Sequence, residues 1–325
     1  MLDLYGRNID YLRISITDKC NFRCKYCMPE DRVATLMNNE ILTFDEIIKI
    51  CKSASKLGIQ KIKVTGGEPL LRDDVTDLIR SIKELPLVKN VTLTTNGVFL
   101  YDKIHELKSS GIDSINISLD TLIKEKFNDI TRRDKFDEVI RGIKEAQNIG
   151  VKIKINSVPI KNFNFDEIVN IAAISKDKNI DVRFIEMMPI GLGESFEGIS
   201  SIEILNILEK EYGKFSRLKV ANGNGPAVYY KNEQFKGHIG FISAVSNEFC
   251  ENCNRIRITA DGFLKPCLCY GTGLDLKGLI RNGINEKELT DEIKRGILSK
   301  PEQHEFNKEK KSSNIEIKKM SQIGG

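Results

Sequence analysis

Three cysteines lie within eight residues near the start of the chain, in the stretch CNFRCKYC. Cys20, Cys24 and Cys27, called the first trio below, follow the spacing C-x3-C-x2-C. A structural zinc site usually has four protein ligands, and a cubane iron–sulfur cluster also normally takes four cysteines. Three thiolates leave one metal position open. The spacing therefore predicts a reactive metal centre, with a structural zinc site as the alternative.

A second group of cysteines lies in the C-terminal part of the chain, in CENCNRIRITADGFLKPCLC. Cys250, Cys253 and Cys267, called the second trio, repeat the count of three, and Cys269 could add a fourth ligand. From the residues alone, two interpretations stay open. The group forms either a second cluster with an open position or a zinc site closed by all four thiolates.

Two arginines lie between the cysteines of this second group. Arg255 and Arg257 are two residues apart on a strand-like segment, so their guanidinium groups should face the same way. Beside a metal, such a pair could bind a carboxylate or a phosphate with paired hydrogen bonds. A solvated basic edge is the alternative.

Composition limits the class of protein. The chain has 325 residues, of which 40% are hydrophobic and 30% charged, as in a globular protein. No apolar run reaches the roughly 18 residues of a membrane span, and the N-terminus lacks the layout of a secretory signal. We therefore expect a cytoplasmic protein, in which eight cysteines indicate metal or redox chemistry rather than disulfides. The net charge of +4 does not indicate nucleic-acid binding.

The elements that position these cysteines follow a repeated pattern. Short β-like runs alternate with helical patterns up to about residue 190, as βα units require. One helix should begin at Thr43, three residues before Glu46 in capping-box spacing, and end at Gly58. Six units predict an α/β fold, a partial (β/α)6 TIM-like barrel by analogy with the eight-unit form. Further helices are expected near 74–84, 101–109, 136–148 and 165–176.

The pattern changes from about residue 215, where two short strands joined by a turn are expected. We predict an appended C-terminal α+β domain that binds the second cluster. The expected division is 1–212 for the barrel, 213–300 for the C-terminal domain and 301–325 for a charged, mobile tail that ends in Gly-Gly.

Alternation within the expected strands gives the sheet one apolar and one polar face. Leu12 and Ile14 alternate with Arg13 and Ser15, and the later strands repeat the pattern. An antiparallel sheet with one wet face is the alternative, but the intervening helices need an apolar face to cover. We therefore expect the polar face to line an incompletely filled barrel that holds an anionic ligand. The further polar residues are Lys61, Lys63, Thr65, Thr92, Thr94, Asn96, Asn116, Ser118, Asp120, Lys152, Lys154 and Asn156.

The first trio resembles the signature of radical S-adenosylmethionine enzymes, and it follows the first strand, where active-site loops of a barrel lie. The stretch TGGEP, Thr65 to Pro69, follows the second strand, and alone it reads as an ordinary tight turn. In the radical S-adenosylmethionine family, a GGEP element at this place contacts the methionine amino group. Together, the first trio and this element indicate the radical S-adenosylmethionine family far more specifically than either one alone.

The resemblance then narrows to the GTP 3′,8-cyclase family of molybdenum cofactor (molybdopterin) biosynthesis. It is carried by TDKCNFRCKYCMP, TGGEPLLR, TTNG, RFIEMMPIG, CNRIRITADGFLKPCL and the terminal Gly-Gly. It implies that the first trio and the second trio each hold a 4Fe–4S cluster, with Cys269 outside the ligand pattern. It places S-adenosylmethionine contacts at Tyr26, Gly67, Ser118 and Met188. It places GTP contacts at Arg13, Lys63, Thr94, Lys154, Arg255 and Arg257, with Arg13, Arg255 and Arg257 at the catalytic centre.

The alternation within the strands independently places three of the implied GTP contacts on the inward polar face. They are Arg13, Lys63 and Lys154. The chain departs from the family at Lys63, where arginine is usual, and a lysine loses the bidentate fork for phosphate. Lys152 shares the face of Lys154 and stays an alternative contact. Because the sequence has no GxxxxGK[ST] loop, side chains must hold the phosphates.

The resemblance implies that a 5′-deoxyadenosyl radical abstracts H3′ of GTP, and that C3′ then bonds to guanine C8 to give 3′,8-cyclo-7,8-dihydro-GTP. It also implies an electron donor such as a flavodoxin or ferredoxin, a downstream pterin-forming enzyme, and a monomer or homodimer. No nucleic acid or membrane partner is expected. Two alternatives are a radical S-adenosylmethionine enzyme that modifies a peptide, and an electron carrier with two clusters. A zinc-stabilised binding protein is the third.

Overall fold

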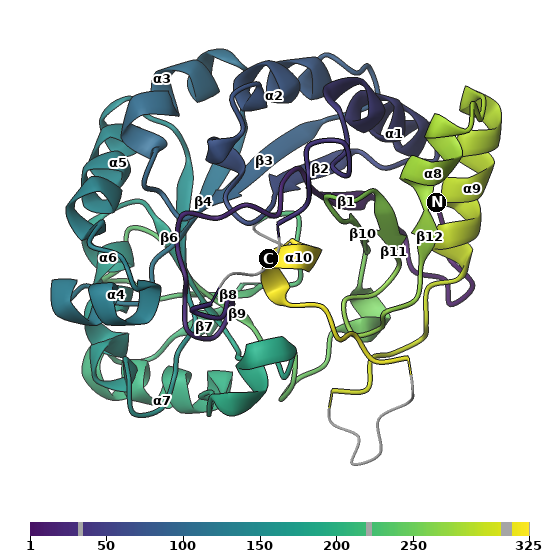
Figure 1. The fold of residues 1–325 in the computed structure, drawn as a ribbon. Coiled ribbons are helices and arrows are strands. Elements are labelled where there is room, and N and C mark those ends of the chain that lie inside the picture. The colour runs from purple at the N-terminus through teal and green to yellow at the C-terminus, as the bar shows by residue number, and fades with distance from the viewer. Residues whose placement is uncertain (32–34, 219–222, 307–313, 325) are drawn as a thin grey trace.

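Six parallel strands form the centre of the fold, and helices cover their outer side (Figure 1). The computed structural model describes residues 1–31, 35–218, 223–306 and 314–324. The strands are β1 (Tyr11–Ser15), β2 (Lys61–Thr65), β3 (Asn90–Thr95), β4 (Ser114–Ser118), β5 (Ile153–Ser157) and β6 (Asp181–Ile185). The helices are α1 (Phe44–Lys56), α2 (Val75–Lys83), α3 (Leu100–Ser109), α4 (Lys124–Thr131), α5 (Phe136–Asn148), α6 (Ile168–Asp177) and α7 (Ser201–Tyr212). The expected six βα units are confirmed.

The C-terminal strands continue the same sheet at both edges. The strand order is β12-β11-β10-β1-β2-β3-β4-β5-β6-β9-β8-β7, with β10 parallel to β1 and β9 parallel to β6. The division at residue 212 stays a prediction, although strands from both sides of it share one sheet. These elements are β7 (Ser216–Arg217), β8 (Val228–Lys231), β9 (Ile239–Ile242), β10 (Arg255–Ile258), β11 (Phe263–Lys265), β12 (Leu274–Asp275), α8 (Leu276–Arg281), α9 (Glu286–Leu298) and α10 (Met320–Ile323).

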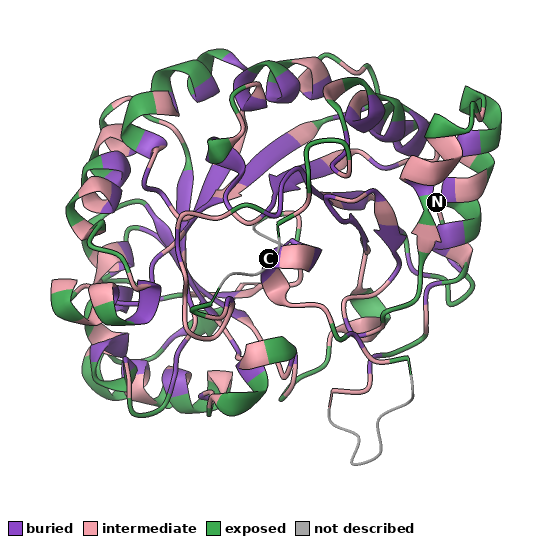
Figure 2. Cartoon of the chain, viewed as in Figure 1, coloured by how far each residue is buried: buried purple, intermediate pink, exposed green. Residues whose placement is uncertain are grey.

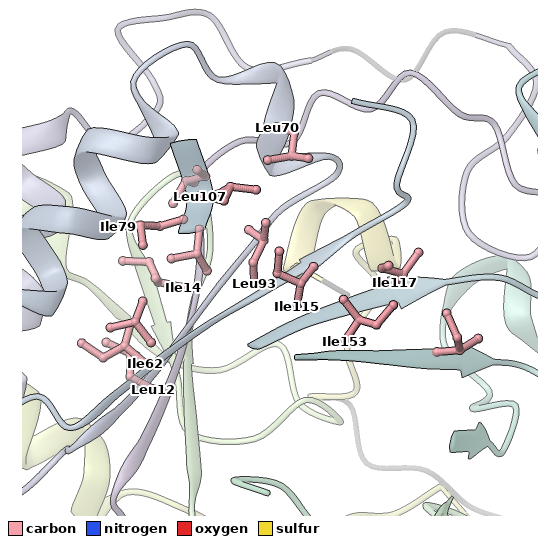
Figure 3. Packing of buried hydrophobic residues seen from close by; sticks show 14 of the residues in the cluster. Leu12, Ile14, Ile62, Leu70, Ile79, Leu93, Leu107, Ile115, Ile117 and Ile153 are labelled. Carbon is pink, nitrogen blue, oxygen red and sulfur yellow. The ribbon is translucent and has the colours of Figure 1, made fainter. Parts of the chain in front are cut away.

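The apolar side chains of the alternating strands form one core. Leu12, Ile14 and Ile62 lie in the apolar core between the sheet and the helices (Figure 3). Figure 2 shows buried strands inside a ring of helices whose outward turns are exposed. Truncating one of these core side chains to alanine would lower the free energy of unfolding by about 2–5 kcal/mol. The opposite face of the same strands is thereby left for polar side chains.

Helix α1 begins as the sequence predicts. The Thr43 hydroxyl accepts a hydrogen bond from the Glu46 backbone N–H at 3.3 Å, and the Glu46 carboxylate accepts one from Thr43 N at 2.8 Å. This capping box satisfies two of the backbone donors that a helix start leaves free. Gly58, just past the helix end, has φ +91°, a conformation that favours glycine.

The end of the chain returns to the barrel, and α10 lies over its centre in Figure 1. Ile315 forms a β-bridge with Tyr270, and Glu316 forms a buried ion pair with Lys265. The tail was predicted to be mobile from its charge, but these contacts hold residues 314–324 against the barrel. Part of the predicted tail, residues 307–313 and Gly325, lies outside the described residues. In the described part of the chain, no helix combines the length and apolarity needed to cross a bilayer.

Candidate active site

A cavity of about 540 Å³ occupies the polar side of the barrel sheet. The inward residues of β1 to β6 line it, as the alternation predicts, together with Arg255 and Arg257 of β10. Among the described residues, its lining includes Leu268 but none of the second trio, which therefore lies beside the cavity rather than in its wall. The predicted residues in the lining are Arg13, Cys20, Cys24, Tyr26, Cys27, Lys63, Gly67, Thr94, Ser118, Lys154, Met188, Arg255 and Arg257.

The loop of the first trio is fixed by the end of helix α4. The backbone N–H groups of Arg23 and Lys25 donate to the carbonyls of Thr131 and Ile130, each at 3.0 Å. Carbonyls at a helix C-terminus lack partners within the helix, so the loop and the helix end satisfy each other. This pairing holds the three thiols at one end of the cavity.

The Gly-Gly pair of the TGGEP element packs directly on the chain that leads into that loop. Gly67 N donates to the carbonyl of Thr17 at 2.8 Å, and a Cβ on Gly67 would lie 2.4 Å from the carbonyl oxygen of Lys19. Only glycine permits this approach. The buried Glu68 carboxylate accepts from Thr95 Oγ1 at 2.7 Å and from Asn96 N at 2.7 Å. The element therefore joins the ends of β1, β2 and β3 and leaves Gly67 at the cavity wall.

The chemistry of the first trio fits an iron–sulfur cluster. Burial, as the main cause, raises the pKa of Cys20 to about 11 and that of Cys27 to about 12, and it raises the pKa of Cys24 well above its usual value. Neighbouring thiolate charges add to the shift at Cys24 and Cys27. Such thiols lose their protons when a metal cation supplies the compensating charge. Three half-buried thiols that line one cavity are thus suited to a metal cluster with one open position.

The second trio has a different electrostatic environment. Burial and the charges of Cys267 and Cys253 raise the pKa of Cys250. Burial also disfavours the Cys253 thiolate, but the positive charges of Arg255 and Lys300 outweigh it and lower the pKa of Cys253 to about 6. A thiolate at neutral pH is a ready metal ligand. The charges of both Cys267 and Cys253 act on the Cys250 thiol, so the three side chains lie in one region of the structure.

Three further residues lie close to the second trio. Ligand atoms of Glu248 and His304 lie within 4.8 Å of each other and of the Cys250 sulfur. Cys269 is fully buried, and its sulfur accepts a hydrogen bond from the backbone N–H of Glu305 at 3.4 Å. Cys269, like Glu248 and His304, is therefore a neighbour of the second trio, and the ligand set of three cysteines stays a prediction.

A row of cations crosses the cavity wall. In the strand register Arg257 lies beside Arg13, and Arg13 lies beside Lys63. Burial first, and neighbouring positive charges second, lower the pKa values of Lys63 and Arg257 well below their usual range. The charges of this row repel one another, so an anion bound across it would relieve the repulsion. A polyphosphate has the required charge and length.

Lys154 also points into the cavity, but an acidic residue balances its charge. Its ammonium group lies 2.9 Å from the Asp181 carboxylate and donates to the Tyr229 hydroxyl at 2.9 Å. Burial opposes ionisation of Asp181, yet Lys154 and His238 outweigh it and lower the carboxyl pKa. Lys152 lines the same cavity and is exposed, whereas Lys154 is buried. Asp181 was not among the residues predicted for the site.

Two more polar residues of the cavity were not predicted as site residues. Arg183 on β6 lines the cavity, and its Nε has no hydrogen-bond partner among the described residues. Alternation on β6 between Val182, Arg183 and Phe184 would have revealed it. Asp120 was assigned to the polar face without a role. Its carboxylate accepts from the Tyr26 hydroxyl at 2.7 Å and from Val158 N at 2.8 Å, and burial raises its pKa to about 6.

Comparison with known proteins identifies the family. A model of the Radical SAM superfamily matches residues 14–174, and a model of Molybdenum Cofactor Synthesis C matches residues 180–306. A GTP 3′,8-cyclase of Clostridium perfringens (strain 13 / Type A) is 47% identical over 325 residues, with 100% of both chains covered. The chain belongs to the GTP 3′,8-cyclase family. A second member, from Petrotoga mobilis (strain DSM 10674 / SJ95), is 41% identical with 100% of both chains covered.

A solved structure supports the fold of this GTP 3′,8-cyclase family member. Streptococcus suis SuiB bound to S-adenosylmethionine matches with a TM-score of 0.61 at 17% identity, covering 90% of this chain and 68% of SuiB. At that identity the likeness shows the fold alone. The predicted radical S-adenosylmethionine fold and enzyme class are confirmed. The predicted cofactors, S-adenosylmethionine and two 4Fe–4S clusters, are those of the family.

Proposed function

We propose that this chain converts GTP into 3′,8-cyclo-7,8-dihydro-GTP, as the name of its curated relatives describes. The observation that carries this proposal is one cavity that is lined both by the first trio and by the cation row, in which Lys63 and Arg257 are buried. An electron carrier would not need such a cavity. When bound, S-adenosylmethionine and its cluster supply the radical that removes a hydrogen atom from the substrate, and the protein positions the reacting groups.

The cation row supports one orientation of the substrate. Arg13, Lys63 and Arg257 lie side by side in the strand register, and the triphosphate would bind where their charges repel most. Arg255 interacts with Cys253 and lines the cavity, so it would meet the part of GTP nearest the second trio. With one end of the substrate held at each site, the ribose would lie between them, in the cavity that the first trio also lines. Orientation of this kind can supply several kcal/mol of the barrier reduction.

Polar atoms in the cavity wall suit a nucleotide and S-adenosylmethionine. Thr92 Oγ1 and Asn156 Oδ1 are buried in the cavity wall and lack hydrogen-bond partners among the described residues. Buried polar atoms are nearly always satisfied, so bound ligands are expected to supply the missing partners. Tyr26, Gly67, Ser118 and Met188 are the proposed S-adenosylmethionine contacts, and Thr94 and Lys154 are further proposed GTP contacts.

We infer that the enzyme works in the cytoplasm as a monomer or homodimer. Its electron donor would be a flavodoxin or ferredoxin, and a pterin-forming enzyme would consume its product.

The proposal is tested by anaerobic reconstitution with iron and sulfide, followed by GTP, S-adenosylmethionine and a reductant. Because the product has the composition of GTP, it must be separated by chromatography. Its tetrahedral C8 should change the ultraviolet spectrum. Arg13→Ala should weaken GTP binding roughly tenfold to a hundredfold, as expected for a lost charged hydrogen bond, and leave S-adenosylmethionine binding nearly unchanged. Arg217→Ala, an exposed position on β7, is the matched control. Equal loss for both ligands, or no new product from the unmodified protein, would refute the proposal.

A further inference from the structure

The C-terminal tail runs beside the segment that carries Cys267. Gly271 N donates to the carbonyl of Asn314 at 2.8 Å, and Glu316 N donates to the carbonyl of Cys269 at 2.8 Å. The tail therefore adds a short β-bridge to the chain that follows this ligand of the second trio.

The same tail continues to the first trio and the cation row. The Ser321 backbone lies beside the Cys27 thiol, where it favours the thiolate, and both residues line the cavity. Three residues later, the carbonyl of Gly324 accepts from Arg257 Nη1 at 3.2 Å. Residues 314–324 thus contact the surroundings of both trios and one cation of the proposed substrate site.

One buried ion pair anchors this tail. Lys265, the last residue of β11, donates to the Glu316 carboxylate, and their side chains are 1% and 2% exposed. Lys265 also donates to the carbonyl of Tyr270, while the Glu316 carboxylate accepts from Lys318 N at 2.7 Å. If the tail left, Lys265 would lose the carboxylate that compensates its charge. A buried charge without its partner is strongly unfavourable.

We propose that the Lys265–Glu316 ion pair positions the C-terminal tail in the active site and links tail docking to loading of the second trio. Lys265 lies two residues before Cys267, and the tail pairs with residues 269–271. A metal bound at Cys267 and a docked tail therefore order the same segment. Each event favours the other to the same degree, because thermodynamic coupling is reciprocal. Lys265 and Glu316 are positioning residues, since they act through the tail.

The direct test is hydrogen exchange of residues 314–324 in the reconstituted protein. Glu316→Gln and Lys265→Met should each accelerate it by roughly a hundredfold, because each leaves one buried group unpaired. Lys265→Met combined with Glu316→Leu should exchange more slowly than either single variant, since a well-packed apolar pair often replaces a buried ion pair without loss. Lys318→Met is the matched control. It removes the half-exposed Lys318–Asp261 pair at 3.0 Å and should change exchange by less than about threefold.

Linkage is tested by replacing the second trio with alanine. In the variant without the second trio, the rate of hydrogen exchange at residues 314–324 should be higher than in the unmodified protein. Adding Glu316→Gln to that variant should raise the rate no further. Wild-type exchange in Glu316→Gln would overturn the anchoring role, and unchanged exchange without the second trio would overturn the linkage. A double variant as fast as the single ones would show that lost packing, not unpaired charge, releases the tail.

The activity readout rests on the proposed function. Glu316→Gln should lower the amount of cyclised GTP per 5′-deoxyadenosine by about tenfold or more, with S-adenosylmethionine binding unchanged. An unchanged ratio would contradict the positioning role. If the unmodified protein formed no cyclised GTP, the proposed function would fail, while the exchange results would still decide the anchoring.

Discussion

Replacing Gly324 by alanine should release the end of the tail from the active site. Gly324 has φ +84° and ψ 95°, a backbone conformation that residues with a Cβ avoid. A Cβ at this position would lie 2.8 Å from Ser15 Cβ and 3.3 Å from Thr65 Cγ2. Both neighbours belong to barrel strands, so they cannot move aside without disturbing the sheet.

The size of the effect follows from two costs. An unfavourable backbone conformation costs about 1–3 kcal/mol, and overpacking at a buried site costs about 1–3 kcal/mol more. Their sum is at least about 2 kcal/mol, and 1.4 kcal/mol is a factor of ten in an equilibrium. The hydrogen bond from Arg257 to Gly324 O, of about 1.5–3 kcal/mol, would be lost when the tail moves. Docking should therefore weaken by more than about tenfold.

The assay compares cyclised GTP with 5′-deoxyadenosine in the same anaerobic reaction. Gly324→Ala should still cleave S-adenosylmethionine, but the product ratio should fall about tenfold or more. Gly283→Ala is the matched control, because Gly283 has φ +85° and no atom within 4 Å of an added Cβ. Gly283→Ala therefore introduces only the unfavourable backbone conformation, at a position away from the cavity. A wild-type ratio in Gly324→Ala would refute the reasoning.

Three further predictions address the metal sites, the substrate charge and stability. Replacing all of the first trio or all of the second trio by alanine should each leave about half of the iron, since each trio holds one cluster; full iron in either variant would contradict this. Because the pKa of Lys63 is lowered well below its usual range by burial and neighbouring cations, GTP binding should take up a proton, and GTP affinity should fall as pH rises. Calorimetry of GTP binding in two buffers measures this proton uptake. The uptake should be smaller for Lys63→Arg than for the unmodified protein, and an equal uptake would show that another group takes the proton. The folded pKa of Asp181 is lowered, so its ionised form stabilises the fold above its unfolded pKa of about 3.9, and this contribution is lost as pH falls through the folded value. Asp181→Asn should therefore lower the free energy of unfolding by about 3–5 kcal/mol at pH 7, where it removes the carboxylate that balances the charge of Lys154, and by less at pH 3. Urea unfolding of the cluster-free protein at both pH values measures this, and an equal loss at both would contradict it.

Local patterns predicted much of the architecture. The alternation around Arg13 and Lys63 placed both side chains on the polar face because side-chain direction in a strand has a period of two. The capping box at Thr43 likewise depends only on residues three apart. Both features are encoded within a few residues, so the sequence alone was sufficient.

Contacts between distant segments could not be predicted in this way. Asp181 lies 27 residues from Lys154, and nothing in either stretch indicates their pairing. Glu316 pairs with Lys265 from a tail whose composition is typical of disorder. These pairs depend on the sheet order, in which strands from the C-terminal region flank the barrel. The connection of the tail to both trios became visible only with the complete fold.

The cyclase function is tested most directly by isotope transfer from GTP deuterated at C3′. In the anaerobic reaction with the reconstituted protein, 5′-deoxyadenosine should gain one deuterium, and cyclised GTP should form in parallel. GTP deuterated at C2′ is the control and should give unlabelled 5′-deoxyadenosine. Unlabelled 5′-deoxyadenosine from the C3′-deuterated substrate would contradict the proposed function.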